Sequence, residues 1–170
     1  MDPTPNQDDE RVYAVIGDVH AHMQHLEQVC TELVTQSLTA VLLVGDIGTP
    51  ELGYQRNRTP QKDAAYLDSV AQVLQRVRAL GAPVLWVPGN HDLTTFPADA
   101  VFAGNIDGRV VSVGDVRIAG FGGAGPGFFG FPYEWSDEGA ALRGVPDCEL
   151  LLAHAPPAQT ALDRLWDGRR

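Results

Sequence analysis

Residues 12–20, Val-Tyr-Ala-Val-Ile-Gly-Asp-Val-His, join a compact apolar run to an abrupt polar turn. The same pattern returns at residues 40–46, Ala-Val-Leu-Leu-Val-Gly-Asp, and at residues 84–92, Val-Leu-Trp-Val-Pro-Gly-Asn-His-Asp. Short, continuous apolar runs closed by turn residues predict buried strands. The three stretches therefore predict three strands, at residues 12–16, 40–44 and 84–87, that share one buried sheet and end in polar loops.

The segments between these strands carry helical periodicity. Apolar residues recur at offsets of 3, 4, 7 and 8 in Leu26–Val34 and at offsets of 3, 4, 7 and 10 in Leu67–Val77, and Gly81 ends the second segment. Residues 48–61, rich in turn formers, are expected to form a loop. Alternating strands and helices with buried strands are typical of a parallel α/β fold.

The second half of the chain predicts antiparallel structure. Two apolar runs flank the turn signal Gly114-Asp115, which indicates a hairpin of strands 110–113 and 116–119. A last short strand is expected at Leu150–Ala153. We interpret residues 1–10 as a disordered acidic tail and residues 11–170 as a single α/β domain.

Composition excludes several classes of function. The 170 residues carry 12 basic and 22 acidic side chains, a net charge of −10, which disfavours binding to nucleic acid or to an anionic membrane. The chain has no apolar run long enough for a membrane span, and its first residues lack the basic and apolar regions of a signal peptide, so we expect neither feature. Cys30 and Cys148 are interpreted as small core residues, so we expect a cytoplasmic protein.

Metal-ligating residue types follow each predicted strand. In open α/β sheets, ligands bind beyond the carboxyl ends of the strands, so these residues are expected to converge on one edge. Oxygen and imidazole donors together suit Mn²⁺, Fe or Zn²⁺ better than Mg²⁺ or Ca²⁺. The ordinary alternative is a set of unrelated turn residues. The residues concerned are Asp18, His20, Asp46, Asn90, His91 and His154.

With these blocks in this order, the chain resembles the calcineurin-like metallophosphoesterases. The matching motifs are Asp-x-His at 18–20, Gly-Asp at 45–46, Gly-Asn-His-Asp at 89–92, and the downstream His154. The later stretch from Ile118 resembles a bacterial and archaeal branch of small stand-alone phosphoesterases. The resemblance implies a two-sheet sandwich flanked by helices. It also implies hydrolysis of small phosphomonoesters or phosphodiesters by a hydroxide that bridges two divalent ions, with manganese preferred over iron or zinc.

The resemblance also implies a role for each motif residue. Asp18 and His20 match ligands of the first ion, and Asp46 matches the carboxylate that bridges both ions. Asn90 and His154 match ligands of the second ion. His91 matches the general acid, which is not a ligand.

One family block has no counterpart in this sequence. The family carries a late Gly-His-x-His segment, yet no His follows His154. We expect a truncated C-terminal part, which would expose a sheet edge and favour self-association. Two alternatives are recruitment of His22, His25 or a neighbouring subunit, and a degenerate site. A degenerate member of the fold would act as a protein-binding scaffold, which is the alternative function.

Several residues beside the motifs are weaker candidates. His22, Arg56 and Arg58 are candidate substrate-binding residues, with solvated surface positions as the ordinary alternative. His25 is expected to be exposed, and Asp92 is a candidate cap for the segment that follows it. An aromatic group is interpreted as a lid or stacking wall over the site or, equally, as a small satellite core. Its members are Phe128, Phe129, Phe131 and Trp135.

Overall fold

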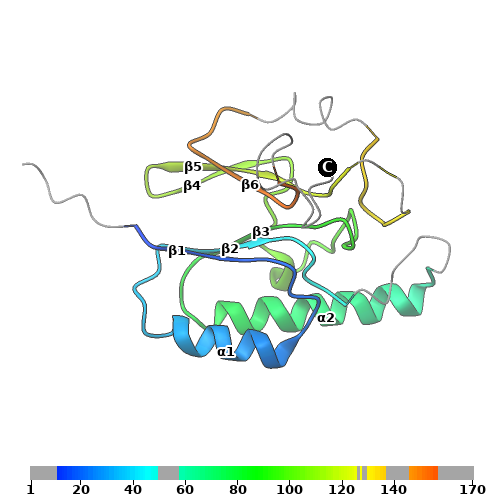
Figure 1. Ribbon diagram of the computed structural model, residues 1–170, viewed down its shortest axis with the longest axis horizontal. Helices are drawn as coiled ribbons and strands as arrows, with labels where there is room; N and C mark the ends of the chain where they lie inside the picture. The colour runs from blue at the N-terminus through cyan, green and yellow to red at the C-terminus, as the bar shows by residue number, and fades with distance from the viewer. Residues whose placement is uncertain (1–10, 50–57, 126, 128–129, 137–145, 157–170) are drawn as a thin grey trace, which may run out of the picture.

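The computed structural model describes residues 11–49, 58–125, 127, 130–136 and 146–156, and the predicted acidic tail lies outside them. The described residues form two three-stranded sheets and two α-helices. Figure 1 shows three layers, with the helices below one sheet and the second sheet above it. The predicted two-sheet α/β sandwich is confirmed, and both helices lie on one flank.

The first sheet is parallel, in the strand order β1-β2-β3. The central strand β2 is apolar throughout because its side chains alternate between two cores, with Val41 and Leu43 facing one and Ala40 and Leu42 the other. Val15 in the edge strand β1 is 62% exposed, so the predicted burial of this strand was wrong on one face. The strands span Tyr13–Ile16 (β1), Ala40–Val44 (β2) and Val84–Val87 (β3).

Helices α1 (Met23–Leu33) and α2 (Pro60–Arg78) cover the outer face of this sheet and form a continuous core with it. Helix α2 begins earlier than its apolar periodicity predicts. The Thr59 hydroxyl accepts a hydrogen bond from the Lys62 backbone N–H at 3.2 Å, and Pro60 occupies the first turn. This exposed first turn carries no apolar signal.

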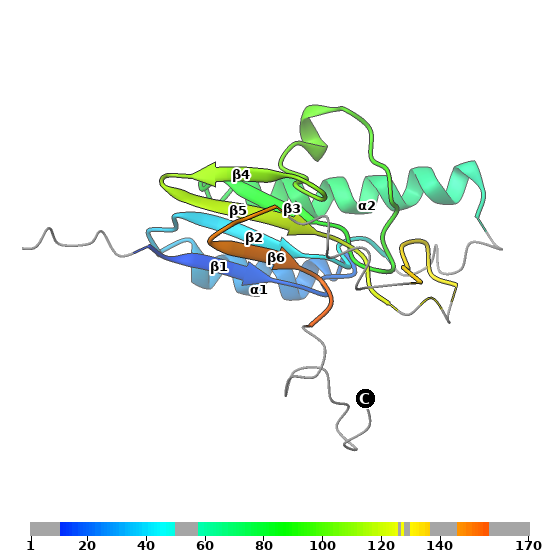
Figure 2. The same cartoon turned by 90° about the horizontal axis from the view of Figure 1, so that it is seen from above.

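The second sheet has the order β4-β5-β6, with an antiparallel pair followed by a parallel one. Gly114, with φ of 62°, makes the predicted hairpin turn. Buried apolar side chains from both sheets form the core between them. Figure 2, turned by 90°, shows β6 lying over the first sheet. The strands span Val110–Val113 (β4), Val116–Phe121 (β5) and Leu150–Ala153 (β6), and a 3₁₀ helix, η3 (Ala100–Phe102), precedes them.

Both cysteines are free thiols. Cys30 is fully buried in the helix-side core, where burial raises the pKa of its thiol, so its predicted place in the core is confirmed. Cys148 is only partly buried, two residues before β6. Among the described residues, no helix has the length and apolar character that crossing a membrane requires.

Candidate metal centre

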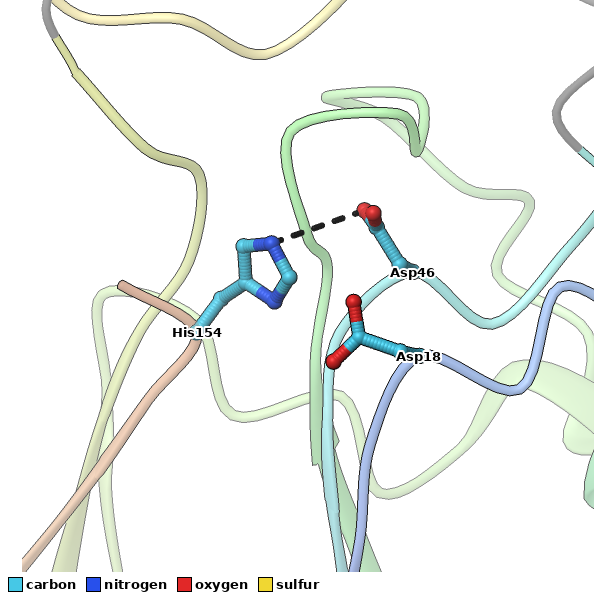
Figure 3. A group of neighbouring side chains, drawn as sticks. All are labelled: Asp18, Asp46 and His154. Carbon is cyan, nitrogen blue, oxygen red and sulfur yellow. Dashed lines mark ion pairs between the residues drawn. The ribbon is translucent and has the colours of Figure 1, made fainter. Parts of the chain in front are cut away.

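Polar side chains from four strand ends meet at one edge of the sandwich. Asp18 follows β1, Asp46 follows β2, Asn90 and His91 follow β3, and His154 follows β6. Figure 3 shows Asp18, Asp46 and His154 close together on loops from both sheets. One ligand atom from each of these three residues lies within 4.8 Å of the others.

The backbone at this edge is held in an unusual conformation. Within the described part of the chain, the residues other than glycine with positive φ all lie in the first two polar turns: Asp18 (53°), His20 (45°), Ala21 (51°) and Asp46 (51°). The two turns are joined by backbone hydrogen bonds, from Asp18 N–H to Gly45 O at 3.1 Å and from His20 N–H to Asp46 O at 2.8 Å. These bonds hold the candidate ligands in a fixed relative position.

Gly45 and Gly89 allow these loops to approach one another. Gly45 has a φ of 88°, and a Cβ at this position would lie 2.6 Å from Gly89 N and 2.6 Å from Nδ1 of His154. A Cβ on Gly89 would collide with the Asp46 carboxylate. The site geometry therefore requires the absence of a side chain at both positions.

Asp46 occupies the centre of the cluster. Its Oδ1 accepts a hydrogen bond from the His91 backbone N–H at 2.9 Å and lies 3.6 Å from Nε2 of His154. Its Oδ2 lies 3.6 Å from Nε2 of His20 and 3.9 Å from Nε2 of His91. Burial raises the pKa of the Asp46 carboxyl. A buried carboxylate with imidazoles near both oxygens is suited to a bridging position between cations.

His154 and Asn90 present their acceptor atoms to the same space. Nδ1 of His154 donates a hydrogen bond to the Val44 carbonyl at 2.7 Å, so Nε2 of the neutral ring carries a lone pair. This Nε2 lies 2.9 Å from Oδ1 of Asn90, which is also an acceptor. Two acceptors facing each other are satisfied by a shared cation.

Two further imidazoles carry orphaned atoms. Nδ1 of His20 and Nδ1 of His91 are buried and have no hydrogen-bond partner in the described part of the chain. An unpaired buried polar atom is costly and calls for a ligand or another partner. The paired acceptors of His154 and Asn90, the carboxylates of Asp18 and Asp46 and the imidazole of His20 fit divalent cations of the manganese, iron or zinc type.

Asp92 has a larger structural role than its motif position indicates. The predicted cap is wrong, because the fully buried carboxylate accepts hydrogen bonds from the backbone N–H groups of Ile47 (3.1 Å), Gly48 (3.3 Å) and Gly89 (2.7 Å). It also accepts the Tyr66 hydroxyl from α2. Asp92 thus ties the loops after β2 and β3 to a helix, and sequence spacing alone gave no signal for this contact.

The aromatic group divides between two locations. The Phe131 ring lies against the imidazole of His91, with centroids 4.0 Å apart, whereas Trp135 packs on Phe121 with centroids 5.0 Å apart. The interpretation as a wall beside the site therefore applies to Phe131, and the interpretation as a small satellite core applies to Trp135. Phe128 and Phe129 lie outside the described residues.

The weaker substrate-binding candidates lie beside the cluster or away from it. His22 and His25 are exposed, and their rings stack with centroids 5.4 Å apart. Both residues line a pocket of about 160 Å³, which Asp18 also lines. The Arg58 guanidinium donates to both Asp63 oxygens, at 3.1 and 2.7 Å, so its side chain is already engaged. Arg56 lies outside the described residues. Substrate contact remains a prediction for His22, Arg56 and Arg58.

Comparison with known proteins identifies the class that this fold and site define. The family model for calcineurin-like phosphoesterases matches residues 12–168, and the chain belongs to that family. Among solved structures it is similar to TT1561 of Thermus thermophilus, at 16% identity and a TM-score of 0.50. That likeness covers 74% of this chain and 56% of TT1561 and concerns the fold alone. No curated protein matches the chain.

Proposed function

We propose that this protein hydrolyses small phosphomonoesters or phosphodiesters with two divalent ions, manganese by preference. The observation that carries the proposal is the position of the buried Asp46 carboxylate. One of its oxygens lies 3.6 Å from the His154 imidazole and the other 3.6 Å from the His20 imidazole. Membership of the phosphoesterase family supports a metal-dependent hydrolase.

In this proposal Asp46 would be a ligand of both ions. Asp18 and His20 complete one set of ligands, and Asn90 and His154 complete the other. When bound, such ions supply Lewis-acid activation of water and of phosphoryl oxygens. Each set has three protein ligands, which leaves positions for substrate.

The local charge favours an anionic substrate despite the net charge of −10. Two divalent ions against the carboxylates of Asp18 and Asp46 leave a local surplus of about +2. Asn90 is neutral and preserves that surplus. A compact phosphate ester is attracted by this local field, whereas a long nucleic acid is also repelled by the net negative charge of the chain.

His91 is proposed as the general acid that protonates the departing ester oxygen. Its backbone N–H donates a hydrogen bond to the Asp46 carboxylate, and its ring lies against Phe131. These two contacts hold the imidazole beside the cluster. Its side chain is 24% exposed, which leaves it accessible to a bound ester. Proton transfer of this kind contributes about 10²–10⁴-fold to a rate.

The Asp46→Asn variant tests this function. We expect it to lose bound manganese and metal-dependent hydrolysis, because one carboxylate is proposed to serve both ions. Metal per chain is measured by elemental analysis and hydrolysis with phenyl phosphate and bis-p-nitrophenyl phosphate. Asp68→Asn, an exposed change on α2, is the matched control and should keep both properties. Near-normal turnover in Asp46→Asn would disprove the proposal. No turnover in the metal-loaded wild type would favour the scaffold function instead.

His91→Ala in the same assay isolates proton donation. The variant should keep its metal. Its rate of hydrolysis should fall more for esters of alkyl alcohols than for esters of p-nitrophenol, because nitrophenolate departs without a proton. Equal losses on both kinds of substrate would contradict the general-acid role.

A further inference from the structure

Phe131 presents an aromatic face beside the candidate proton donor. Its ring is tilted 47° to the His91 imidazole, with the centroids 4.0 Å apart. His91 in turn meets the His20 ring edge-on at 5.4 Å. The three rings form a continuous row that begins at a candidate metal ligand and ends at Phe131. The Phe131 side chain is only partly buried.

The segment that carries Phe131 is fixed to the metal loops. The Tyr133 backbone N–H donates to the Asn90 carbonyl at 3.1 Å, directly beside a candidate ligand. The Tyr133 hydroxyl donates to Asp107 at 2.8 Å, and the Phe131 N–H donates to Glu134 at 3.2 Å. Phe131 is therefore held at the site by its own hydrogen bond to Glu134 and by the hydrogen bond from Tyr133 to the loop after β3.

We propose that Phe131 contacts the alcohol portion of the substrate and selects phosphoesters whose alcohol carries a planar aromatic ring next to the ester oxygen. This inference rests on the proposed function. A proton passed from His91 must reach the ester oxygen, so that oxygen lies beside the imidazole. The carbon group attached to it then extends past His91, where Phe131 offers a flat apolar surface.

Aromatic stacking distinguishes a flat ring from a saturated one of similar size. Offset or tilted aromatic pairs gain energy beyond the area they bury, and a puckered cyclohexyl ring lacks the π-system that provides it. The discrimination expected from one such contact is roughly two- to tenfold. Trp135 does not compete for this role, because its indole packs on Phe121 and its Nε1 donates to Gly122 O at 2.9 Å.

The test compares two phosphonates that cannot be hydrolysed, benzylphosphonate and cyclohexylmethylphosphonate. They share the anionic group and the one-carbon link to a six-membered ring, which is aromatic and planar in the first and saturated and puckered in the second. Their dissociation constants are measured by isothermal titration calorimetry on manganese-loaded full-length protein. We expect the wild type to bind benzylphosphonate more tightly, by roughly two- to tenfold.

Phe131→Leu should reduce this ratio to about one while keeping the affinity for cyclohexylmethylphosphonate, because leucine preserves apolar bulk without a π-face. Phe96→Leu is the matched control and should keep the wild-type ratio. Phe96 packs in the helix-side core against Trp86, with centroids 4.8 Å apart.

The outcomes separate this inference from the proposed function. Hydrolysis of phenyl phosphate by the wild type without a preference between the phosphonates overturns the aromatic selection alone. An equal loss of affinity for both phosphonates in Phe131→Leu assigns Phe131 to positioning His91 and also overturns it. A preference that Phe131→Leu removes supports the selection even if hydrolysis is absent. Failure of both phosphonates to bind overturns the aromatic selection, whereas the proposed function is decided by the hydrolysis assay.

Discussion

At the scale of single residues, strain and metal-binding chemistry coincide. Asp18, His20 and Asp46 have left-handed backbone conformations, which cost roughly 1–2 kcal/mol for a residue with a Cβ. Such conformations persist only where surrounding contacts over-determine them. Here the hydrogen bonds between the first two polar turns supply those contacts. Part of the favourable free energy of folding therefore offsets the strain at the candidate ligands.

Gly45 and Gly81 offer a matched test of this packing. Their φ angles are 88° and 83°, so alanine carries similar backbone strain at both, roughly 1–2 kcal/mol. Only at Gly45 would the new Cβ meet neighbours, among them His154, since Gly81 has nothing within 4 Å. We expect Gly45→Ala to cost more unfolding free energy in urea and to lose bound manganese, whereas Gly81→Ala keeps its metal. Equal metal content in the two variants would contradict this account of the site.

The sequence predicts the candidate ligands because they lie in recognisable motifs. It does not predict the residues whose roles depend on contacts between distant segments of the chain. Asp18, Asp46 and Asn90 each follow a strand of the parallel sheet, whose topology alone predicts their convergence, whereas His154 follows β6 of the second sheet and lies outside that rule. The position of Phe131 against His91 depends on a loop folding back across some 40 residues of chain. No local periodicity encodes such a contact. The same holds for Tyr66 and Asp92.

At the scale of elements, strand positions were more predictable than helix ends. Strands β2, β3, β4 and β6 have the predicted bounds, because buried strands appear as short apolar runs between turn residues. Helix α2 begins at Pro60 although the apolar stripe predicts a start near Leu67. The exposed first turn is set by its cap, and η3 is too short to show any periodicity.

Tyr66 connects α2 to the metal loops and can be tested against Tyr133. Burial and the neighbouring Asp92 raise the pKa of Tyr66 well above its ordinary value, so its hydroxyl stays a donor. Tyr66→Phe leaves Asp92 buried with one donor fewer, and we expect a loss of about 1.5–3 kcal/mol in urea unfolding. Tyr133→Phe removes a similar bond to Asp107 at a partly buried site and should cost less. A larger loss in Tyr133→Phe would show that Tyr66 is not a structural anchor.

The ion pair between Arg117 in β5 and Glu149 before β6 should make stability depend on pH. Hydrogen bonds from the Arg117 side chain lower the pKa of Glu149 from 4.5 to about 2. A lowered carboxyl pKa stabilises the fold above the unfolded-state value, and that contribution disappears as pH falls from about 4.5 toward 2. The pair is exposed, so the effect is small and weakened by salt.

Urea midpoints of the wild type and of Glu149→Gln, compared at pH 5.5 and pH 3, test this dependence. The wild type should lose more stability than the variant between these values at low salt, and the difference should shrink in high salt. An identical pH response in both proteins would exclude a contribution from this pair.

At the scale of the whole molecule, the candidate centre joins the two sheets. Asp18, Asp46 and Asn90 follow strands of the first sheet, whereas His154 follows β6 of the second. A ligand that binds only the folded arrangement stabilises the entire chain by mass action. Metal and fold are therefore expected to be thermodynamically linked.

Manganese at about 100 times its dissociation constant should raise the unfolding free energy by about 2.7 kcal/mol per site. Thermal unfolding with manganese and with EDTA measures this shift. His154→Ala removes the ligand from the second sheet and should lower the metal-dependent shift. An unchanged shift in that variant would mean that the metal is held by the first sheet alone.

The position of His154 also has a consequence for anyone who redesigns this protein. Its Nδ1 donates a hydrogen bond to the Val44 carbonyl of the first sheet. The separation of the sheets therefore sets the distance from its Nε2 to the Asp46 carboxylate. That separation is set by the side chains between the sheets, Leu42, Ile118 and Leu152 among them. A thermostabilising library that enlarges these residues would alter the geometry of the candidate metal centre from a distance. Screens for heat resistance should therefore score metal retention in the same round.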